Sequence, residues 1–455
     1  LSPSPYEPLY TAAEMREAEA RYPGFPGTAS ELMERAGIAV AREAMRAFPS
    51  ARRFAVVCGG GANGGDGRIA AHVLREAGRE AVETDEPEGY DVVADALFGT
   101  GFHGEPRPEA AALIARINAA GVPVVSVDVP SGVNASTGEV AGSAVEAAVT
   151  VTFHGSKVGL VVAPGRFHAG RVVVADIGLE QTSTAARRAT EAILDLVPRR
   201  GARDSKHTAG RVLVVGGSRG MGGAVCLAGE AAFRADAGYV TVAVPHDVLP
   251  VVGNRLLEPV KVGFSAEDMV ETVLGAAERA DAVALGPGLG REPHVEECVR
   301  ELLERLDLPM VVDADALFGL EPAQRTAPTI LTPHAGELAR LLGESSARVD
   351  AHRLEAARRC AERYRAVVLL KGADTIIVSP VGDVIVADAA PPALATAGTG
   401  DVLTGVIAAF LAKGLDAETA AVTGAVAHGR AATLVRHQVG LIASDVIAAL
   451  PRALA

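Results

Sequence analysis

Residues 53–77 read RFAVVCGGGANGGDGRIAAHVLREA, and this stretch decides the fold class of the first half of the chain. The apolar, β-branched run at residues 53–58 predicts a short buried strand. Glycines follow it at once, and the pattern then changes to the Ala-rich helical spacing of residues 68–77. A strand that runs through a glycine-rich turn into a helix is typical of an α/β sheet.

The same alternation of strand and helix continues along the first half. Residues 91–95 and 123–128 predict two more strands, and residues 108–119 predict the helix between them. Strands that alternate with helices imply a parallel sheet with helices on both faces. Ligands bind at the carboxyl ends of such strands, where Asp95 and Asp128 fall together with the glycine-rich turn.

The second half of the chain begins this pattern again after residue 200. Its predicted strands each precede a glycine or proline turn and lie at residues 211–215, 239–244, 282–285, 310–313 and 366–370. Between the halves, residues 181–203 are polar and helix-like, and we interpret them as a linker. With a prior of ~150 residues per domain, the sequence predicts two α/β domains, at residues 1–200 and 201–455.

Composition narrows the possible partners and the compartment. The net charge is −13 and no basic tract stands out, which argues against nucleic acid and anionic membranes as partners. No apolar run reaches the ~18 residues that a membrane-spanning helix needs, and the N-terminus lacks a secretion-signal pattern. The four cysteines are widely spaced, which predicts reduced thiols in a cytoplasmic protein.

The strongest chemical motif of the second half is Ala397-Gly-Thr-Gly-Asp401, which precedes an apolar helix at residues 402–411. Glycines at a helix start leave several backbone N–H groups free to face an anion, and the helix dipole favours negative charge there. Asp401 at the mouth of this anion hole can take a proton from a hydroxyl that attacks phosphorus. Alone, the motif is equally compatible with a simple Gly-Asp turn.

Five other loops at predicted strand ends strengthen the case for a phosphate site. They are Gly216-Gly-Ser-Arg-Gly-Met-Gly-Gly-Ala224, Gly286-Pro-Gly-Leu-Gly290, Asp313-Ala-Asp315, Thr332-Pro-His-Ala-Gly-Glu337 and Lys371-Gly-Ala-Asp-Thr375. Each one is more often an ordinary turn. Their occurrence together at the carboxyl ends of strands favours a nucleotide-using enzyme.

This set of motifs resembles the ribokinase-like superfamily, and within it the NAD(P)H-hydrate dehydratases, from about residue 204 to the C-terminus. Related small-alcohol kinases tend to have Asn where this chain has His334, so His334 favours the dehydratases. The resemblance implies that the hydrated dinucleotide contacts Ala224, Gly288, His334 and Asp401. It implies that the nucleotide contacts Lys371, Gly372, Ala373, Asp374, Thr375 and Gly400.

The chemistry implied by the resemblance fits these residues. Asp401 would take the proton of the C6 hydroxyl on the hydrated nicotinamide ring, and that oxygen would attack the terminal phosphate of ADP. Magnesium would bridge the phosphates and be held through water near Glu337. The alternative role for Glu337 is a carboxylate that closes a capping box at the helix start.

The glycine-rich turn of the first half, residues 59–67, is the second strong motif. Its backbone amides can cradle a pyrophosphate, and Asn63 and Asp66 add side-chain oxygens to the loop. Asn63, Asp95 and Ser131 together offer oxygen ligands without Cys or His, which suits potassium better than zinc. Alternatively, Asn63 and Asp95 only brace turns.

With Leu32-Met-Glu-Arg-Ala-Gly37 and Asp176-Ile-Gly178, these residues resemble the NAD(P)H-hydrate epimerase family over about residues 9–180. The resemblance implies that Asp128 is the acid/base, that Asn63, Asp95 and Ser131 hold potassium, and that two loops bind the substrate. The loop residues are Ala62, Asn63, Gly64, Gly65, Asp66, Gly99, Thr100, Gly101, Phe102, His103, Gly104 and Glu105. Two positions depart from the family: Ala62 stands where Asn is usual, and Glu19 where Asp is usual.

Two residues after the predicted strand at residues 150–153, His154 and Lys157, could face this site, but we expect a surface role for them.

The two resemblances fit one another. They predict a Rossmann-like αβα epimerase domain followed by a ribokinase-like αβα dehydratase domain, acting on the hydrates of NADH and NADPH (NADHX and NADPHX). Both families self-associate, which implies a homo-oligomer, and the fusion favours ADP over ATP. The alternatives are a small-alcohol kinase fused to a binding domain, and an N-terminal half that binds without catalysing.

Overall fold

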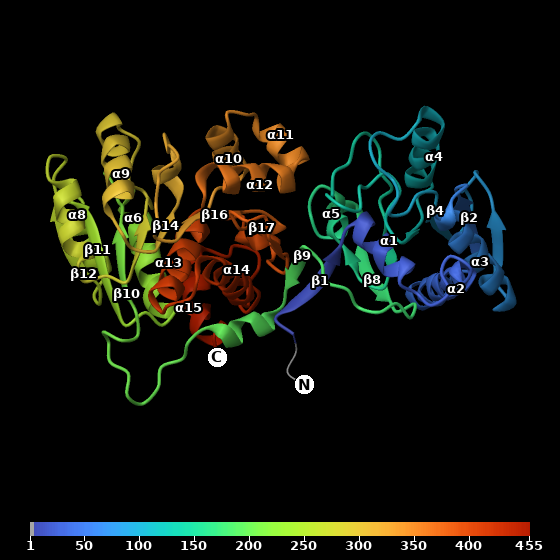
Figure 1. Ribbon diagram of the computed structural model, residues 1–455, viewed down its shortest axis with the longest axis horizontal. Helices are drawn as coiled ribbons and strands as arrows, with labels where there is room; N and C mark the ends of the chain where they lie inside the picture. The colour runs from blue at the N-terminus through green and yellow to red at the C-terminus, as the bar shows by residue number, and fades with distance from the viewer. Residues whose placement is uncertain (1–3) are drawn as a thin grey trace. The chain divides into compact units, whose positions relative to one another are not determined.

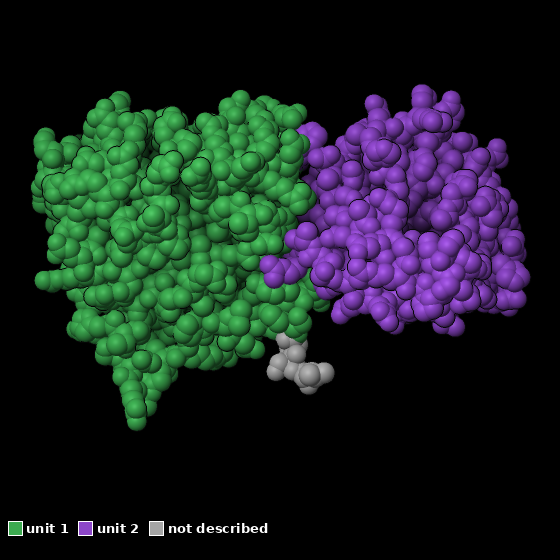
Figure 2. Space-filling view, viewed as in Figure 1, with its two compact units in different colours: residues 1–7, 188–349, 353–455 green, residues 8–187, 350–352 purple. Residues whose placement is uncertain are grey.

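A computed structural model describes residues 4–455 and divides the chain into two compact units. The N-terminal unit holds residues 8–187 and 350–352, and the C-terminal unit holds residues 4–7, 188–349 and 353–455 (Figure 2). Each unit has a sheet and helices of its own (Figure 1).

The N-terminal unit contains a six-stranded sheet in which every neighbouring pair is parallel. Its order across the sheet is β3 (Glu80–Glu83), β2 (Arg53–Cys58), β4 (Val92–Ala96), β5 (Val124–Val127), β6 (Val149–Phe153) and β8 (Arg171–Ala175). The strand predicted at residues 53–58 is confirmed, and those predicted at residues 91–95 and 123–128 differ by one residue at either end.

Helices cover both faces of this sheet because its strands are apolar on both sides. Phe54 and Val56 of β2 pack in one cluster with residues of α2 (Ala29–Ala47) and α3 (Ala62–Glu76). Ala55 and Val57, which point the other way, pack against α4 (Pro108–Ala119). This two-sided burial is characteristic of parallel α/β sheets.

Two short elements from distant parts of the chain add to the N-terminal unit. Strand β1 (Tyr6–Tyr10) leads into helix α1 (Ala12–Ala20), which a Thr11–Glu14 capping box begins. The two-residue strand β7 (Ser156–Lys157) pairs in parallel with β1, so that Tyr10 lies opposite Lys157. This pairing fixes the position of Lys157.

The C-terminal unit is built around a larger, mainly parallel sheet. Its parallel strands are β12 (Val260–Phe264), β11 (Tyr239–Pro245), β10 (Arg211–Val215), β13 (Ala282–Leu285), β14 (Met310–Val312), β15 (Thr329–Leu331) and β16 (Val367–Leu370). Two antiparallel strands, β17 (Thr375–Val378) and β18 (Val384–Ala387), continue the sheet beyond β16. The five strands predicted for this half are all present, which confirms the α/β fold class.

Four Ala-rich helices cover one face of this sheet. Helices α6 (Gly222–Arg234), α13 (Thr399–Ala412), α14 (Ala417–Thr433) and α15 (Ala443–Ala453) share one buried cluster with β10, β13 and β16. Helix α13 is buried along almost its whole length, which fixes its N-terminus. The remaining helices are α7 (Leu249–Arg255), α8 (Met269–Ala277), α9 (Pro293–Arg305), α10 (Ala335–Leu342), α11 (Ser346–Ala351) and α12 (Arg353–Tyr364).

Residues 181–203 are not one continuous helix, and the division between the two units falls within them, between Arg187 and Arg188. They contain strand β9 (Ala186–Ala189) and the 3-10 helix η2 (Glu191–Leu196). Ile193, Leu194 and Val197 are buried in the core of the C-terminal unit, so these apolar residues fix the segment. The four cysteines are free, and no helix within residues 4–455 is long and apolar enough to cross a membrane.

Candidate active sites

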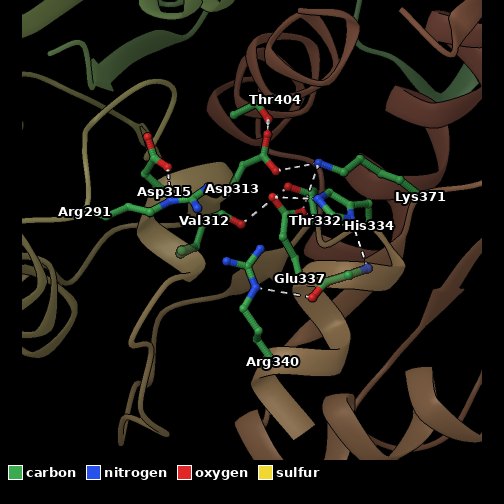
Figure 3. Close-up of polar contacts among 11 residues, drawn as sticks. Arg291, Val312, Asp313, Asp315, Thr332, His334, Glu337, Arg340, Lys371 and Thr404 are labelled. Carbon is green, nitrogen blue, oxygen red and sulfur yellow. Dashed lines mark hydrogen bonds and ion pairs between the residues drawn. The ribbon is translucent and has the colours of Figure 1, made fainter. Parts of the chain in front are cut away.

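The carboxyl ends of β13 to β16, helix α10 and Thr404 of α13 bring together a group of charged and polar side chains in the C-terminal unit (Figure 3). Asp313 follows β14 and is almost completely buried. Its Oδ1 lies 2.8 Å from Lys371 Nζ at the end of β16, and its Oδ2 accepts a 2.6 Å hydrogen bond from Thr404 of α13. One buried carboxylate therefore ties together two strand ends and the helix that carries Asp401.

Lys371 is charged and directed toward the start of α13. Burial opposes its charge, but the Asp313 and Glu337 carboxylates outweigh burial and raise the pKa of Lys371. A Cβ added at Gly400 would lie 3.5 Å from Lys371 Nζ, so the ammonium is close to the backbone of the first helical turn. This combination of an ammonium with helix N–H groups is suited to bind an anion.

Asp401 lies in that first turn and is only partly exposed. Gly398, with φ of +89°, is the N-cap residue, a conformation that glycine adopts without strain. Burial and the neighbouring Asp313 carboxylate raise the pKa of Asp401 to about 7, although Lys371 acts in the opposite direction. A carboxyl that titrates near neutrality is poised to accept a proton.

The structure brings together two of the residues expected to contact the dehydratase substrate. Gly288 has φ of +63°, and a Cβ there would lie 3.0 Å from the Cβ of Ala224. The loop after β13 therefore lies against the start of α6, and a side chain at Gly288 would separate them.

His334 is the N-cap residue of α10, and Glu337 closes the capping box predicted as its alternative role. The Gly336 N–H donates to Nδ1 of His334 at 3.0 Å, and the His334 N–H donates to Glu337 Oε2 at 2.8 Å. The same Glu337 oxygen lies 3.8 Å from Lys371 Nζ, so its carboxylate also borders the anion site. The His334 side chain remains more than half exposed.

A buried ion pair fixes the segment at residues 371–375, which is expected to contact the nucleotide. Asp374 is 1% exposed, and its Oδ2 accepts a 3.0 Å hydrogen bond from Nε of Arg353. A Cβ at Gly372 would lie 2.3 Å from the Arg353 guanidinium. The Asp374 carboxylate therefore fixes the turn after β16. A ligand bound there would contact mainly the backbone atoms of the turn.

In the N-terminal unit, Asp128 follows β5 with φ of +68°, a left-handed conformation that costs energy in a non-glycine residue. Its Oδ1 lies 2.9 Å from Lys157 Nζ and accepts a 3.1 Å hydrogen bond from Thr152. Its Oδ2 accepts a long hydrogen bond from the backbone of Thr100. These contacts fix the Asp128 side chain at the strand end.

The expected surface role of Lys157 is wrong. Its side chain is 0% exposed, and besides Asp128 its ammonium donates to Thr152 Oγ1 and to the Phe153 and Gly155 carbonyl oxygens. Lys157 is buried because it lies in the two-residue strand β7, which pairs with the distant strand β1. No local pattern around residue 157 indicates that distant partner.

Asp95 and Ser131, two residues expected to hold a cation, are in direct contact. Ser131 donates through both its Oγ, at 2.6 Å, and its N–H, at 2.9 Å, to the Asp95 carboxylate. Asp95 is completely buried, and burial raises its pKa against the effect of these hydrogen bonds. The part of the chain that the structure describes supplies no ammonium or guanidinium group against this carboxylate.

Asn63, the third residue of that set, lies across the site from the loop after β4. A Cβ at Gly99 would lie 3.0 Å from Asn63 Oδ1 and 3.3 Å from Asp128 Oδ2, so glycine allows these groups to approach. Only Gly59, Gly60 and Gly61 form a turn before the helix, because α3 begins at Ala62 rather than at residue 68. The amides of the later residues therefore belong to the first turns of a helix.

The two remaining epimerase-like motifs are in contact with each other. Arg35, within the first motif, donates a 2.9 Å hydrogen bond to the carbonyl oxygen of Ile177, within the second. A Cβ at Gly37 would lie 2.7 Å from the carbonyl oxygen of Asp66, so this glycine allows α2 and α3 to pack closely. These motifs support the site through packing.

Sequence reasoning missed two residues at the site of the N-terminal unit and one in the C-terminal unit. Glu19 of α1 was noted only as a departure, yet burial and the Asp128 carboxylate raise its pKa, which puts it among the charged groups of the site. The sequence favours a surface position for Lys157 and gives no indication of Thr404. Each becomes recognisable only through a contact between elements distant in the sequence.

Fold and site geometry define a class of protein: a two-unit α/β enzyme in which each unit has an aspartate beside a glycine-rich helix start, suited to nucleotide-like substrates. Comparison with known proteins specifies the family. The family described as NAD(P)H-hydrate dehydratase matches residues 212–452, and the family described as YjeF-related protein N-terminus matches residues 29–88 and 77–159.

Relatives match across almost the whole chain. It is 39% identical to a bifunctional NAD(P)H-hydrate repair enzyme of Moorella thermoacetica, covering 97% of this chain and 96% of that one. It is 33% identical to the Escherichia coli enzyme of the same description, covering 98% and 93%. An ADP/ATP-dependent NAD(P)H-hydrate dehydratase of Bacillus subtilis, co-crystallised with ATP and Mg²⁺, superposes with a TM-score of 0.53 at 33% identity, covering 58% of this chain and 96% of that one. The chain belongs to the family of bifunctional NAD(P)H-hydrate repair enzymes.

Proposed function

We propose that this chain restores NADH and NADPH from their hydrates, with the C-terminal unit dehydrating the S hydrate and the N-terminal unit interconverting the R and S hydrates. Membership of the bifunctional repair family supports the pairing of the two activities. The observation that carries the proposal is the partly exposed Asp401 carboxyl, with a pKa raised to about 7, beside the Lys371 ammonium and the glycine-rich start of α13.

In the dehydratase reaction, Asp401 takes the proton of the C6 hydroxyl, and the oxygen attacks the terminal phosphorus of ADP, releasing AMP. The ring nitrogen then expels the phosphate ester as inorganic phosphate while a proton leaves C5, which restores the dihydronicotinamide. Lys371 and the helix N–H groups at Gly400 stabilise the charge on the transferred phosphoryl group. Ala224, Gly288 and His334 would border the hydrated ring.

Magnesium bound with ADP would neutralise charge on the phosphates. Asp313 and Asp315 already pair with Lys371 and Arg291, so their carboxylates suit direct coordination poorly. Glu337, which carries no comparably close cation, would hold the ion through water.

In the epimerase reaction, Asp128 takes the proton of the same C6 hydroxyl so that the ring opens at that centre and closes on its other face. The segments at residues 62–66 and 99–105 would hold the hydrated dinucleotide through their backbone amides. The ion pair with Lys157 supports this role because it fixes the position of the Asp128 carboxyl at the end of β5.

The alternative, a small-alcohol kinase joined to a binding module, is not favoured. The family match over residues 212–452 is to dehydratases, and His334 occupies the position where such kinases tend to have Asn.

Incubating the purified chain with a mixture of R and S hydrates and ADP is expected to return both to NADH. Recovery would be followed by NADH absorbance, with the two hydrates separated by chromatography. If only the S hydrate disappears, the chain has no epimerase activity. If neither hydrate changes, both proposed activities are contradicted. Replacing ADP by ATP, and NADH hydrate by NADPH hydrate, would rank the substrates.

Potassium is expected to support epimerisation without affecting dehydration. The oxygens of Asn63, Asp95 and Ser131 would hold it, and it would supply the positive charge that the buried Asp95 carboxylate lacks. Epimerisation rates would be compared in potassium and tetramethylammonium buffers of equal ionic strength. Equal rates in the two buffers would contradict a potassium site.

A further inference from the structure

Asp66 is a carboxyl of the N-terminal unit that the chemistry of Asp128 leaves unexplained. It lies in the second turn of α3 and is 8% exposed. Among residues 4–455, no group forms a hydrogen bond or ion pair with its carboxyl. Its oxygens are not fully enclosed, so the carboxyl has no protein partner and is open to a ligand in the site.

The backbone fixes the position of this carboxyl. Gly37 of α2 lies against the carbonyl oxygen of Asp66, where a Cβ would come within 2.7 Å. Asp66 is therefore held between two packed helices and is not part of a loop that can turn away.

The charges around Asp66 are unbalanced. Asp128 at the end of β5 and Glu19 of α1 both repel negative charge on Asp66. Lys157 of β7 attracts the carboxylates of Asp128 and Glu19. The Lys157 ammonium is in direct contact with Asp128, and Arg16 of α1 acts on Glu19, so neither cation is paired with Asp66. Burial, followed by repulsion from Asp128 and Glu19, raises the pKa of Asp66 to about 8.

We propose that Asp66 is the proton donor of the epimerase site and acts together with Asp128 on opposite ends of the bond that opens. This inference rests on the proposed epimerase function and adds to it a second catalytic residue. An ionised carboxylate beside a protonated one is the arrangement that concerted general base and general acid catalysis requires.

The proton balance needs two such groups. When the ring opens, the C6–N1 bond breaks and its electron pair goes to N1, which takes the proton of Asp66. At the same time the C6 hydroxyl gives its proton to Asp128 and becomes an aldehyde. After rotation about C5–C6 the N1–H attacks the other face of the aldehyde. The two carboxyls then reverse their proton transfers, so no electron or proton is gained or lost overall.

The test uses the full chain without ADP, at constant potassium concentration, with R hydrate as substrate and chromatographic separation of the two hydrates. Asp66→Asn keeps the size of the side chain but cannot donate the proton. It is expected to lower kcat by about 10²–10⁴-fold, the range of general acid catalysis, with KM changed much less. In the unchanged chain, kcat/KM is expected to fall above pH of about 8, and this decline should be absent from Asp66→Asn.

Two further variants separate chemistry from folding. Asp66→Glu retains a titratable carboxyl and should keep the alkaline decline, and formate should restore part of the activity of Asp66→Ala. As a matched control, Glu76→Gln removes an exposed carboxyl from the end of the same helix and should behave as the unchanged chain.

Three results would overturn the inference. Asp66→Asn could keep its kcat, or Glu19→Gln rather than Asp66→Asn could remove the alkaline decline. If the unchanged chain does not interconvert the hydrates at all, the epimerase function itself fails, and the role of Asp66 falls with it.

Discussion

Asp401→Asn is expected to lower the rate of ADP-dependent dehydration of the S hydrate by about 10²–10⁴-fold, because the amide cannot take the proton of the C6 hydroxyl. Asparagine has nearly the same shape, and the Asp313–Lys371–Thr404 contacts do not involve residue 401, so the site should remain intact. The epimerase in the other unit of the same chain supplies an internal control and should keep its rate. NADH absorbance would measure dehydration, and chromatography would measure epimerisation.

The same assignment has a consequence for pH. Burial and the Asp313 carboxylate raise the pKa of Asp401 to about 7, while Asp315 and Glu337 act in the same direction and Lys371 opposes them. A general base must be deprotonated, so kcat/KM for dehydration should fall as the pH is lowered through about 7. Dehydration that survives in Asp401→Asn, or a rate that is constant across this range, would contradict the role of Asp401.

The sequence predicts the sheets well because their strands are signalled locally. Residues 53–58, 211–215 and 282–285 are short, mainly apolar runs that glycine follows directly, and all three are strands with these bounds. Asp95, Asp128 and Asp313 lie at the carboxyl ends of parallel strands, which is the position that the sequence predicts for Asp95 and Asp128. Local pattern therefore suffices where burial on both faces and a following turn define the element.

Contacts between distant residues account for what the sequence did not predict. The Lys371–Asp313 ion pair joins residues 58 apart, and the hydrogen bond between Thr404 and Asp313 joins residues 91 apart. The sequence predicts a surface position for Lys157 because its burial depends on a strand pair with Tyr10, which no local pattern indicates. For Glu337 the sequence predicts either a magnesium site held through water or a capping box; the capping box is present, and the same carboxylate also lies 3.8 Å from Lys371 Nζ, a contact with no local signal.

Asp128→Asn is expected to abolish interconversion of the hydrates while ADP-dependent dehydration of the S hydrate continues. The amide cannot accept the proton of the C6 hydroxyl, a loss worth about 10²–10⁴-fold in rate. A mixture of hydrates given ADP should therefore return only its S fraction to NADH, beyond what the slow spontaneous reaction supplies. Full recovery at the unchanged rate would remove Asp128 from the mechanism.

This substitution should also destabilise the N-terminal unit, and the two effects can be separated. Lys157 is 0% exposed, so loss of the Asp128 charge leaves a buried ammonium with only neutral oxygen partners. Breaking one side of a buried ion pair typically costs about 3–5 kcal/mol, measurable by urea unfolding. The double variant Asp128→Asn with Lys157→Met removes both charges and should regain much of that free energy of unfolding, yet remain unable to interconvert the hydrates. If the double variant instead regains epimerisation, the defect of Asp128→Asn is one of folding, and the proton is taken by another group.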